Sequence, residues 1–196
     1  MQITITTGTG QGPTPVAAFD AALRDAGVAN YNLIYLSSVI PTKSVIQRAK
    51  YVTPITEYGY RLYLVMARHD AQVVGEMAWA GLGWTQEQET GRGLFVELHG
   101  TSRSQVERDI HTTLDSMIVS RPLRYGGIES ELVGIECHGE PVCALAMAVY
   151  KSEGWESNIR RAQQKQRGTN RNLRLSLAPY QKSSALTSRV TLLEER

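Results

Sequence analysis

Two adjacent serines, Ser37 and Ser38, interrupt an apolar, β-branched stretch over residues 32–41. Such a stretch is typical of a buried strand, where a hydroxyl without a hydrogen-bond partner costs about 1–3 kcal/mol. Either each hydroxyl bonds a nearby backbone group, or the pair does chemistry. That chemistry is self-cleavage, in which the Oγ atom of the second serine attacks the preceding carbonyl and this serine becomes a pyruvoyl group. On this pattern alone, the structural explanation is favoured over the chemical one.

The elements that must position these serines follow from hydrophobic periodicity and capping signals. Thr14 is a good N-cap for one helix and Ser102 for another. The glycines over 8–12 predict a loop, and Gly139-Glu140-Pro141 predicts a hairpin between the last two strands. This mixture predicts an α+β fold, or a layered α/β arrangement, whose sheet order the sequence leaves open. Helices are predicted over 14–26, 70–79 and 102–120, and strands over 2–7, 32–40, 59–67, 93–98, 132–138 and 142–150.

Composition predicts one domain with a charged tail. The chain has 196 residues, of which 42% are hydrophobic, enough for a sizeable core. The formal net charge is +2, but residues 157–196 carry nine Lys and Arg against two Glu, so this segment is +7 and the remainder −5. We expect a solvated, flexible extension, with a packed extension that covers a neighbouring subunit as the alternative. Its basic residues lack interleaved aromatic residues, which argues against nucleic-acid binding.

Cysteine content and apolar run lengths bound the cellular context. Cys137 and Cys143 are too few for a disulfide framework. No signal peptide and no apolar run of membrane-spanning length is visible, so we expect a cytoplasmic protein that does not contact a membrane. Cys137 and His138 are adjacent on a predicted strand and point to opposite faces, so we expect no metal site there.

Several motifs occur together in the order and spacing of one known family. They are Thr7–Gly12 with Thr14-Pro15, Ala18-Phe19-Asp20, Asn32-Leu33-Ile34, Ser37-Ser38-Val39-Ile40-Pro41, Gly93-Leu94-Phe95-Val96-Glu97 and Cys143-Ala144-Leu145-Ala146. No single motif is specific, but their combined order is. On these residues the chain resembles the pyruvoyl-dependent arginine decarboxylases over about residues 3–150. It departs from them at Thr42, where the family often has a second proline.

The resemblance implies an architecture and a maturation step. The fold would be a four-layer αββα sandwich, assembled as a homotrimer or a dimer of trimers. The decarboxylase domain would cover residues 1–152, and cleavage between Ser37 and Ser38 would divide the chain into a β fragment, 1–37, and an α fragment, 38–196. Residues 153–196, the basic C-terminal extension, have no counterpart in the short members of the family.

The implied reaction is decarboxylation of L-arginine to agmatine and CO₂. The amine of this amino-acid substrate would form a Schiff base with a pyruvoyl group made from Ser38. The chain shows no phosphate-binding loop and no lysine in a clear cofactor context, so we expect neither pyridoxal phosphate nor a metal. Lys43, Arg48 and Lys50 would disfavour a cationic substrate if they line the pocket. Two alternatives stay open: the same chemistry on another amino acid, and an unprocessed, non-catalytic relative that binds a cationic ligand.

Three further residues receive roles from the resemblance. Asn32 supports processing or catalysis, and in an extended strand it would share a face with Ser38. Glu97 is the acid that protonates the substrate α-carbon after CO₂ leaves, with a pKa raised by burial. Asp20 pairs with the guanidinium of arginine. The structural alternatives are a strand-end hydrogen bond for Asn32 and solvent-facing carboxylates for Glu97 and Asp20.

Overall fold

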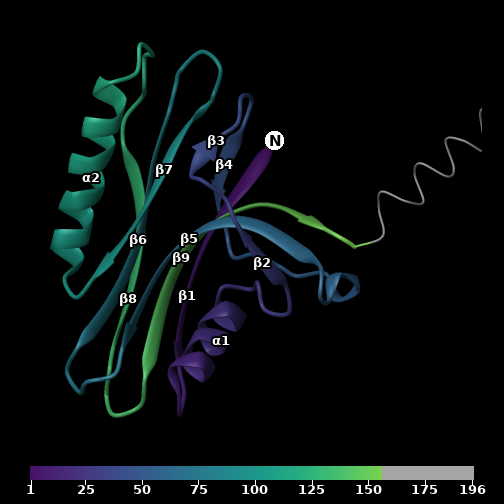
Figure 1. Ribbon diagram of the computed structural model, residues 1–196, viewed down its shortest axis with the longest axis vertical. Helices are drawn as coiled ribbons and strands as arrows, with labels where there is room; N and C mark the ends of the chain where they lie inside the picture. Colours follow the sequence, from purple (N-terminus) through teal and green to yellow (C-terminus); the bar gives the residue numbers. More distant parts are fainter. Residues whose placement is uncertain (156–196) are drawn as a thin grey trace, which may run out of the picture. The chain divides into compact units, whose positions relative to one another are not determined.

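A computed structural model describes residues 1–155, which form two β-sheets with one helix on the outer face of each (Figure 1). The five strands of sheet A lie in the order β2 (Asn32–Tyr35), β5 (Arg61–Ala71), β9 (Val142–Glu153), β1 (Gln2–Gln11) and β4 (Val45–Arg48). The four strands of sheet B lie in the order β3 (Val39–Ile40), β7 (Gly93–Gly100), β6 (Met77–Gln86) and β8 (Glu129–Glu136). The helices are α1 (Pro15–Asp25), α2 (Arg103–Val119) and the short 3₁₀-helix Ile55–Glu57. The basic extension is predicted over residues 153–196. It lies almost entirely outside the described residues, so its predicted flexibility or packing stays a prediction.

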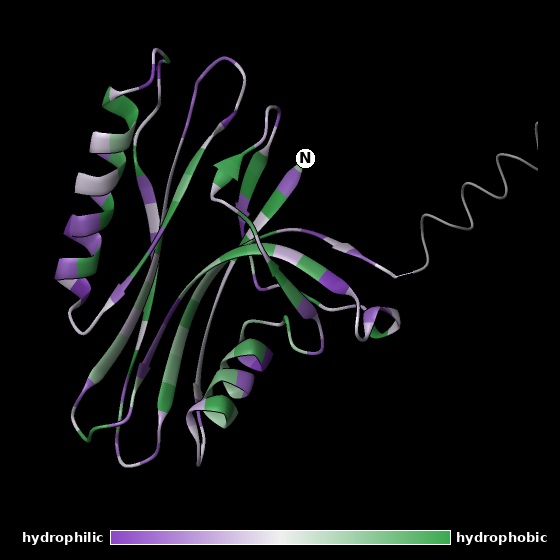
Figure 2. Ribbon diagram, viewed as in Figure 1, coloured by the Kyte–Doolittle hydropathy of each residue, from purple (hydrophilic) through white to green (hydrophobic). Residues whose placement is uncertain are grey.

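Three hydrophobic cores define four layers. The first lies between the sheets and contains Leu82, Trp84 and Phe95. A second lies between α1 and sheet A, and a third lies between α2 and sheet B. In Figure 2 the hydrophobic residues of α2 face sheet B and its polar residues face away. The predicted α+β class and the αββα layering are therefore confirmed.

Helix α1 begins as predicted, but the glycine-rich segment before it is not a loop. Thr14 caps the helix by accepting a hydrogen bond from the Ala17 N–H group at 3.2 Å. Strand β1 continues to Gln11, so Gly8 and Gly10 lie within it. A Cβ atom at either glycine would lie 2.3 Å from a carbonyl oxygen of α1. These glycines therefore let the helix backbone lie directly against the strand.

The predicted helix over residues 70–79 is wrong. Strand β5 runs through Ala71, and β6 begins at Met77 after a short turn. Gly81 and Gly83, which follow the predicted helix and could end it, lie inside β6 beneath α2. A Cβ atom on Gly83 would lie 2.2 Å from Ile110 of α2, so a larger residue would push the helix off the sheet. Because β6 is buried on both faces, its apolar residues do not alternate, and periodicity does not separate it from a helix.

The predicted hairpin between the last two strands is also wrong. Strand β8 pairs with β6 in sheet B, whereas β9 pairs with β1 and β5 in sheet A. Residues 137–141 therefore carry the chain from one sheet to the other. Hydrophobic patterns identify both strands, but they do not say to which sheet each belongs.

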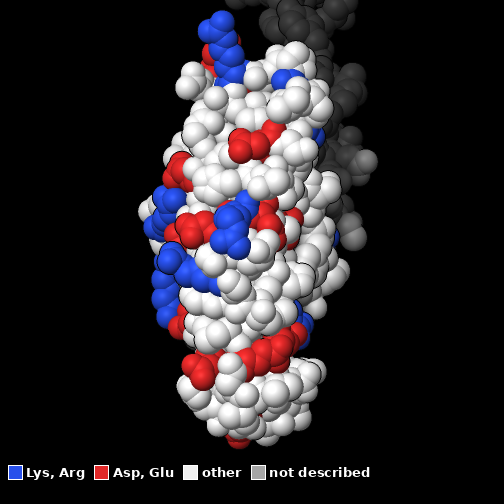
Figure 3. Space-filling model, turned by 90° about the vertical axis from the view of Figure 1, so that its left-hand side faces the viewer, with Lys and Arg blue, Asp and Glu red and all other residues white. Residues whose placement is uncertain are grey.

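The outer face formed by α2 mixes acidic and basic side chains and does not gather one sign of charge (Figure 3). Within α2, Arg103 and Arg108 alternate with Glu107 and Asp109. Within the described residues, 1–155, no helix is long and apolar enough to cross a membrane.

Candidate active site

The Ser37–Ser38 peptide joins the two sheets. The single strand predicted over 32–40 is in fact two strands, because β2 pairs with β5 in sheet A and β3 pairs with β7 in sheet B. On one side, the Leu36 N–H group donates to the Leu64 carbonyl oxygen at 2.9 Å. On the other side, the Ser38 carbonyl oxygen accepts from the Phe95 N–H group at 2.8 Å. The two serines therefore occupy the point at which the chain leaves one sheet for the other.

Ser38 has an unfavourable backbone conformation. Its φ angle is +50°, in the left-handed region that residues with a Cβ atom rarely adopt. Such a conformation costs about 1–3 kcal/mol and persists only where surrounding contacts enforce it. Ser37 is exposed and Ser38 is half-buried, so the expectation that both lie within a buried strand is wrong. Strain at this peptide replaces burial as the physical reason to suspect chemistry.

Glu97 lies against the Ser38 hydroxyl. The Ser38 Oγ atom is 2.7 Å from Oε1 and 2.9 Å from Oε2 of Glu97, so the hydroxyl donates to the carboxylate. Burial raises the pKa of Glu97, and the hydrogen bond from Ser38 opposes that rise in part. A carboxyl group whose pKa is raised holds its proton to a higher pH than an ordinary one does. The structure thus brings together two of the predicted site residues, Ser38 and Glu97, in one hydrogen-bonded pair.

Tyr150 completes this cluster, and the sequence had not singled it out. The hydroxyl of Tyr150, near the end of β9, donates to the Val39 carbonyl oxygen at 3.0 Å. Its ring packs edge-on against Phe95, with centroids 6.2 Å apart. Burial, together with the nearby negative charge of Glu97, raises the pKa of Tyr150, so its hydroxyl stays protonated. The available signal was an aromatic residue with a polar tip at the end of an otherwise aliphatic strand.

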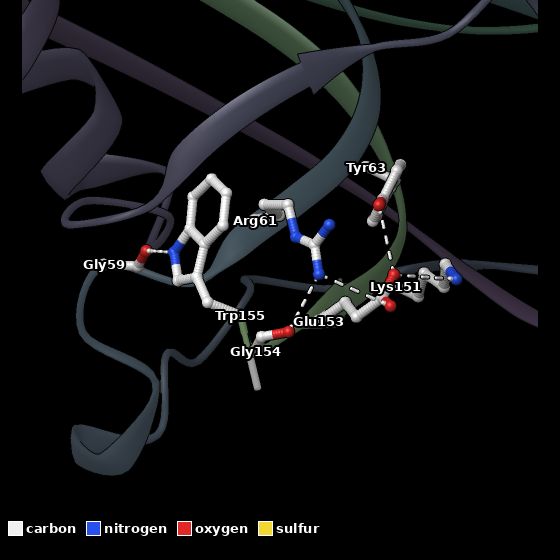
Figure 4. Close-up of polar contacts among 7 residues, drawn as sticks. All are labelled: Gly59, Arg61, Tyr63, Lys151, Glu153, Gly154 and Trp155. Atoms are coloured by element: carbon white, nitrogen blue, oxygen red, sulfur yellow. Dashed lines mark hydrogen bonds and ion pairs between the residues drawn. The ribbon is translucent and has the colours of Figure 1, made fainter. Parts of the chain in front are cut away.

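Asn32 is held at the start of β2. Its side-chain amide donates to the Gly59 carbonyl oxygen at 2.7 Å. The same oxygen accepts a hydrogen bond from the Trp155 indole at 2.8 Å, and Trp155 lies over the Arg61 guanidinium (Figure 4). Because β2 ends at Tyr35, the shared-face relationship does not extend from Asn32 to Ser38. Among residues 1–155, no hydrogen bond joins these two side chains.

Asp20 lies on the solvent side of α1. Its side chain is 60% exposed and forms an ion pair with Arg24 at 3.3 Å. The neighbouring Phe19 ring is covered by the Arg68 guanidinium, 4.0 Å from its centroid. The structure therefore does not bring Asp20 to Ser38 within the described part of one chain, and its predicted role in binding guanidinium stays a prediction.

Two of the three basic residues that follow the serine motif, Arg48 and Lys50, form ion pairs with acidic neighbours. Arg48 forms ion pairs with Glu129 and Glu131 at 3.0 and 3.1 Å. Lys50 lies 3.5 Å from a carboxylate oxygen of Asp25. Their charge is thus offset by acidic neighbours, which weakens the objection that they would repel a cationic substrate.

No metal centre is found in the described region. Among residues 1–155, no three His, Cys, Asp or Glu side chains converge as a metal site requires. Cys137 and Cys143 are both buried and unbridged.

Comparison with known proteins identifies relatives over most of the described residues. A family model described as pyruvoyl-dependent arginine decarboxylase matches residues 2–154. A relative of that name from Halobacterium salinarum is 42% identical over 96 residues, which cover 49% of this chain and 59% of the relative. Relatives of the same name from Thermoplasma volcanium and Thermococcus sibiricus are 30% and 28% identical over 98 and 140 residues. These matches cover 50% and 71% of this chain, and 54% and 87% of the relatives. The chain thus spans less than two thirds of the length of the Halobacterium and Thermoplasma relatives.

Proposed function

Because the chain belongs to the pyruvoyl-dependent arginine decarboxylase family, as its sequence motifs predict, we propose that it is a self-processing decarboxylase that converts L-arginine to agmatine and CO₂. One observation carries this proposal. The Ser38 hydroxyl lies 2.7 Å from the carboxyl group of Glu97, at a strained peptide that joins two sheets. The nucleophile, its proton acceptor and the bond to be broken are therefore together before cleavage.

Self-cleavage would begin at this pair of residues. Ser38 Oγ passes its proton to Glu97 and attacks the carbonyl carbon of Ser37, so that the peptide bond breaks and an ester replaces it. Loss of the Cα proton of residue 38 then breaks the Cβ–Oγ bond and releases Ser37 as a carboxylate. Residue 38 is left as dehydroalanine, which takes up water and loses ammonia to become a pyruvoyl group. The products are the fragments 1–37 and 38–196.

The residues around Ser38 fit a pyruvoyl group at this position. The Phe95 N–H group already binds the carbonyl oxygen of residue 38, and the Glu97 carboxyl group lies beside its side chain. The pyruvoyl group supplies the electron sink that decarboxylation needs. Glu97, whose pKa is raised by burial, would in its protonated form give a proton to the substrate α-carbon after CO₂ has left. This route requires neither pyridoxal phosphate nor a metal ion.

The proposal also covers the residues that would bind the substrate and the assembly of several copies of the chain. Asp20 would exchange its exposed partner Arg24 for the substrate guanidinium, and Asn32 would orient the segment that leads to Ser37. We propose a homotrimer or a dimer of trimers in the cytoplasm. Exposed apolar side chains on both sides of the serines, such as Tyr35 and Val39 at 59% exposure each, support a surface that another copy covers.

A substrate panel tests the activity. Purified protein is incubated with L-arginine, L-ornithine, L-lysine and L-aspartate, and the released CO₂ and amine products are measured. We expect agmatine from arginine and much slower turnover of the others. Decarboxylation of a different amino acid would support the alternative, the same chemistry on another substrate. The solvent-facing position of Asp20 is consistent with that alternative. Cleaved protein with no activity on any amino acid would contradict it.

A further inference from the structure

Tyr150 reaches across the layer between the two sheets to the residue that follows Ser38. It belongs to β9 in sheet A, whereas Val39 belongs to β3 in sheet B. The hydroxyl of Tyr150 donates to the Val39 carbonyl oxygen at 3.0 Å. This hydrogen bond therefore ties the C-terminal side of the scissile peptide to the opposite sheet.

Strand β3 is held mainly through one of its two residues. It contains two residues, Val39 and Ile40, paired with Leu94 and Gly93 of β7. Ile40 is fully buried between the sheets and anchors the strand, whereas Val39 is 59% exposed, so packing does little to hold Val39 itself. After cleavage, residue 38 would be a chain end, attached to the molecule through this short strand. Between residue 38 and the buried Ile40, the hydrogen bond from Tyr150 is therefore a direct cross-sheet contact to the backbone of the exposed residue, Val39.

The environment of Tyr150 makes its hydroxyl a dependable donor. The residue is 8% exposed, and its ring is held edge-on by Phe95. Phe95 also donates its backbone N–H group to the Ser38 carbonyl oxygen at 2.8 Å. Phe95 therefore joins three parts of the site: the ring of Tyr150, the strand that carries Glu97, and the segment that contains the serines.

We propose that Tyr150 is a positioning residue for this site, which acts through the Val39 carbonyl group to hold residue 38 against Glu97. Before cleavage, it keeps Ser38 in its strained conformation with Oγ on the carboxylate. After cleavage, it keeps the new chain end within reach of the same carboxyl group. This inference rests on the proposed function, since it concerns both reactions of that site.

Tyr150→Phe tests the role of the hydroxyl while keeping the ring against Phe95. We expect self-cleavage to be about tenfold slower and kcat about tenfold lower, because small displacements of reacting groups have large effects on rate. KM should stay within about twofold, because the hydroxyl of Tyr150 is proposed to act through the Val39 carbonyl group and not on the substrate. Cleavage is followed by intact mass after cell-free synthesis of the full chain, and turnover is measured on the cleaved fraction.

Tyr31→Phe is the matched control. The Tyr31 hydroxyl also donates to a carboxylate, that of Glu57, but its ring packs in the core between α1 and sheet A. We expect wild-type cleavage and kcat from this variant. Thermal unfolding of both variants shows whether a loss of rate merely follows a loss of stability.

Wild-type cleavage and kcat in Tyr150→Phe would overturn the inference while leaving the proposed function intact. An equal loss in both variants, in proportion to their unfolding temperatures, would also overturn it. Tyr150→Leu, which removes ring and hydroxyl together, should lose at least as much rate as Tyr150→Phe, and a smaller loss would count against the hydroxyl. If the wild-type protein itself does not cleave, the proposed function fails rather than the role of Tyr150.

Discussion

The two sides of the Ser37–Ser38 peptide are held very differently. On the N-terminal side, β2 is a four-residue edge strand paired with β5, the Leu36 N–H group donates to the Leu64 carbonyl oxygen, and Tyr35 to Ser37 are exposed. On the C-terminal side, hydrogen bonds from Phe95 and Tyr150 hold the carbonyl groups of Ser38 and Val39, and Glu97 holds the Ser38 hydroxyl. From Ser37 to Val39, the contacts thus concentrate on the residues that would carry the reactive group.

This difference suits a chain that cuts itself. The carboxyl group of Ser37 has to leave, so strong contacts there would hold the product in place. The group made from residue 38 has to stay beside Glu97 for every later turnover. Strain at Ser38 favours breakage, and the contacts around Val39 limit movement to the leaving side.

Ser38→Ala should have the largest effect, because it removes the only oxygen that can make the ester at this position. We expect an uncut, inactive chain by intact mass and by CO₂ release from arginine. Ser37→Ala is the matched control on the other side of the bond, and it should still be cut. A cleaved Ser38→Ala protein, or an uncut Ser37→Ala protein, would break the comparison.

Glu97→Gln should reduce turnover by about 10²–10⁴-fold, the usual range for loss of a general acid. It should also slow self-cleavage, because glutamine cannot take the Ser38 proton. Glu131→Gln serves as the control, since Glu131 lies in β8 and pairs with Arg48. Normal activity of Glu97→Gln would remove this residue from the chemistry.

The two reactions should depend on pH in opposite directions. Burial raises the pKa of Glu97 above the ordinary carboxyl value. Glu97 must be ionised to accept the Ser38 proton, so the cleavage rate should rise as pH passes up through this pKa. It must be protonated to return a proton in turnover, so kcat should fall over the same range, by up to about tenfold per pH unit. Rates of both reactions are compared across pH, and parallel profiles would count against a shared role of Glu97.

Asp20→Asn should raise KM for arginine by about 10–100-fold, the range for losing a charge-assisted hydrogen bond, and leave self-cleavage unchanged. Arg24→Gln is its control, because it removes the ion-pair partner and keeps the carboxylate. Steady-state kinetics of the two variants show whether KM depends on the Asp20 carboxylate itself or on its ion pair with Arg24. An unchanged KM in Asp20→Asn would mean that the guanidinium of the substrate arginine binds at another residue.

Asn32→Ala should have the smallest effect, because its amide acts on the loosely held side, through Gly59. We expect about a tenfold loss in cleavage rate or kcat, the value of one hydrogen bond. Trp155→Phe removes the other hydrogen bond to the same Gly59 oxygen. If both variants lose equally, Asn32 acts by holding the turn at Gly59; if Asn32→Ala loses more, its amide has a further role.

Sequence reasoning recovered the elements whose signals are local. Thr14 and Ser102 cap α1 and α2 as expected, and β7 begins at Gly93 as predicted. Ser38 and Glu97 lie 59 residues apart in the chain, and only the family resemblance linked them before the structure did.

What sequence reasoning missed depends on long-range packing. Gly81 and Gly83 look like helix breakers until α2 is placed over them. The step from sheet A to sheet B at Ser37, and the reach of Tyr150 to Val39, need the arrangement of both sheets. The hydrophobic pattern of a strand indicates that the strand is buried, but it does not indicate which of the two sheets the strand joins.

The state of the Ser37–Ser38 bond is the most direct test. An intact-mass spectrum of the purified protein under denaturing conditions should show two fragments, 1–37 and 38–196. The larger fragment should carry a ketone in place of an N-terminal amine, as its reaction with phenylhydrazine would show. A single chain of 21.7 kDa would contradict self-cleavage and return the two serines to a structural role.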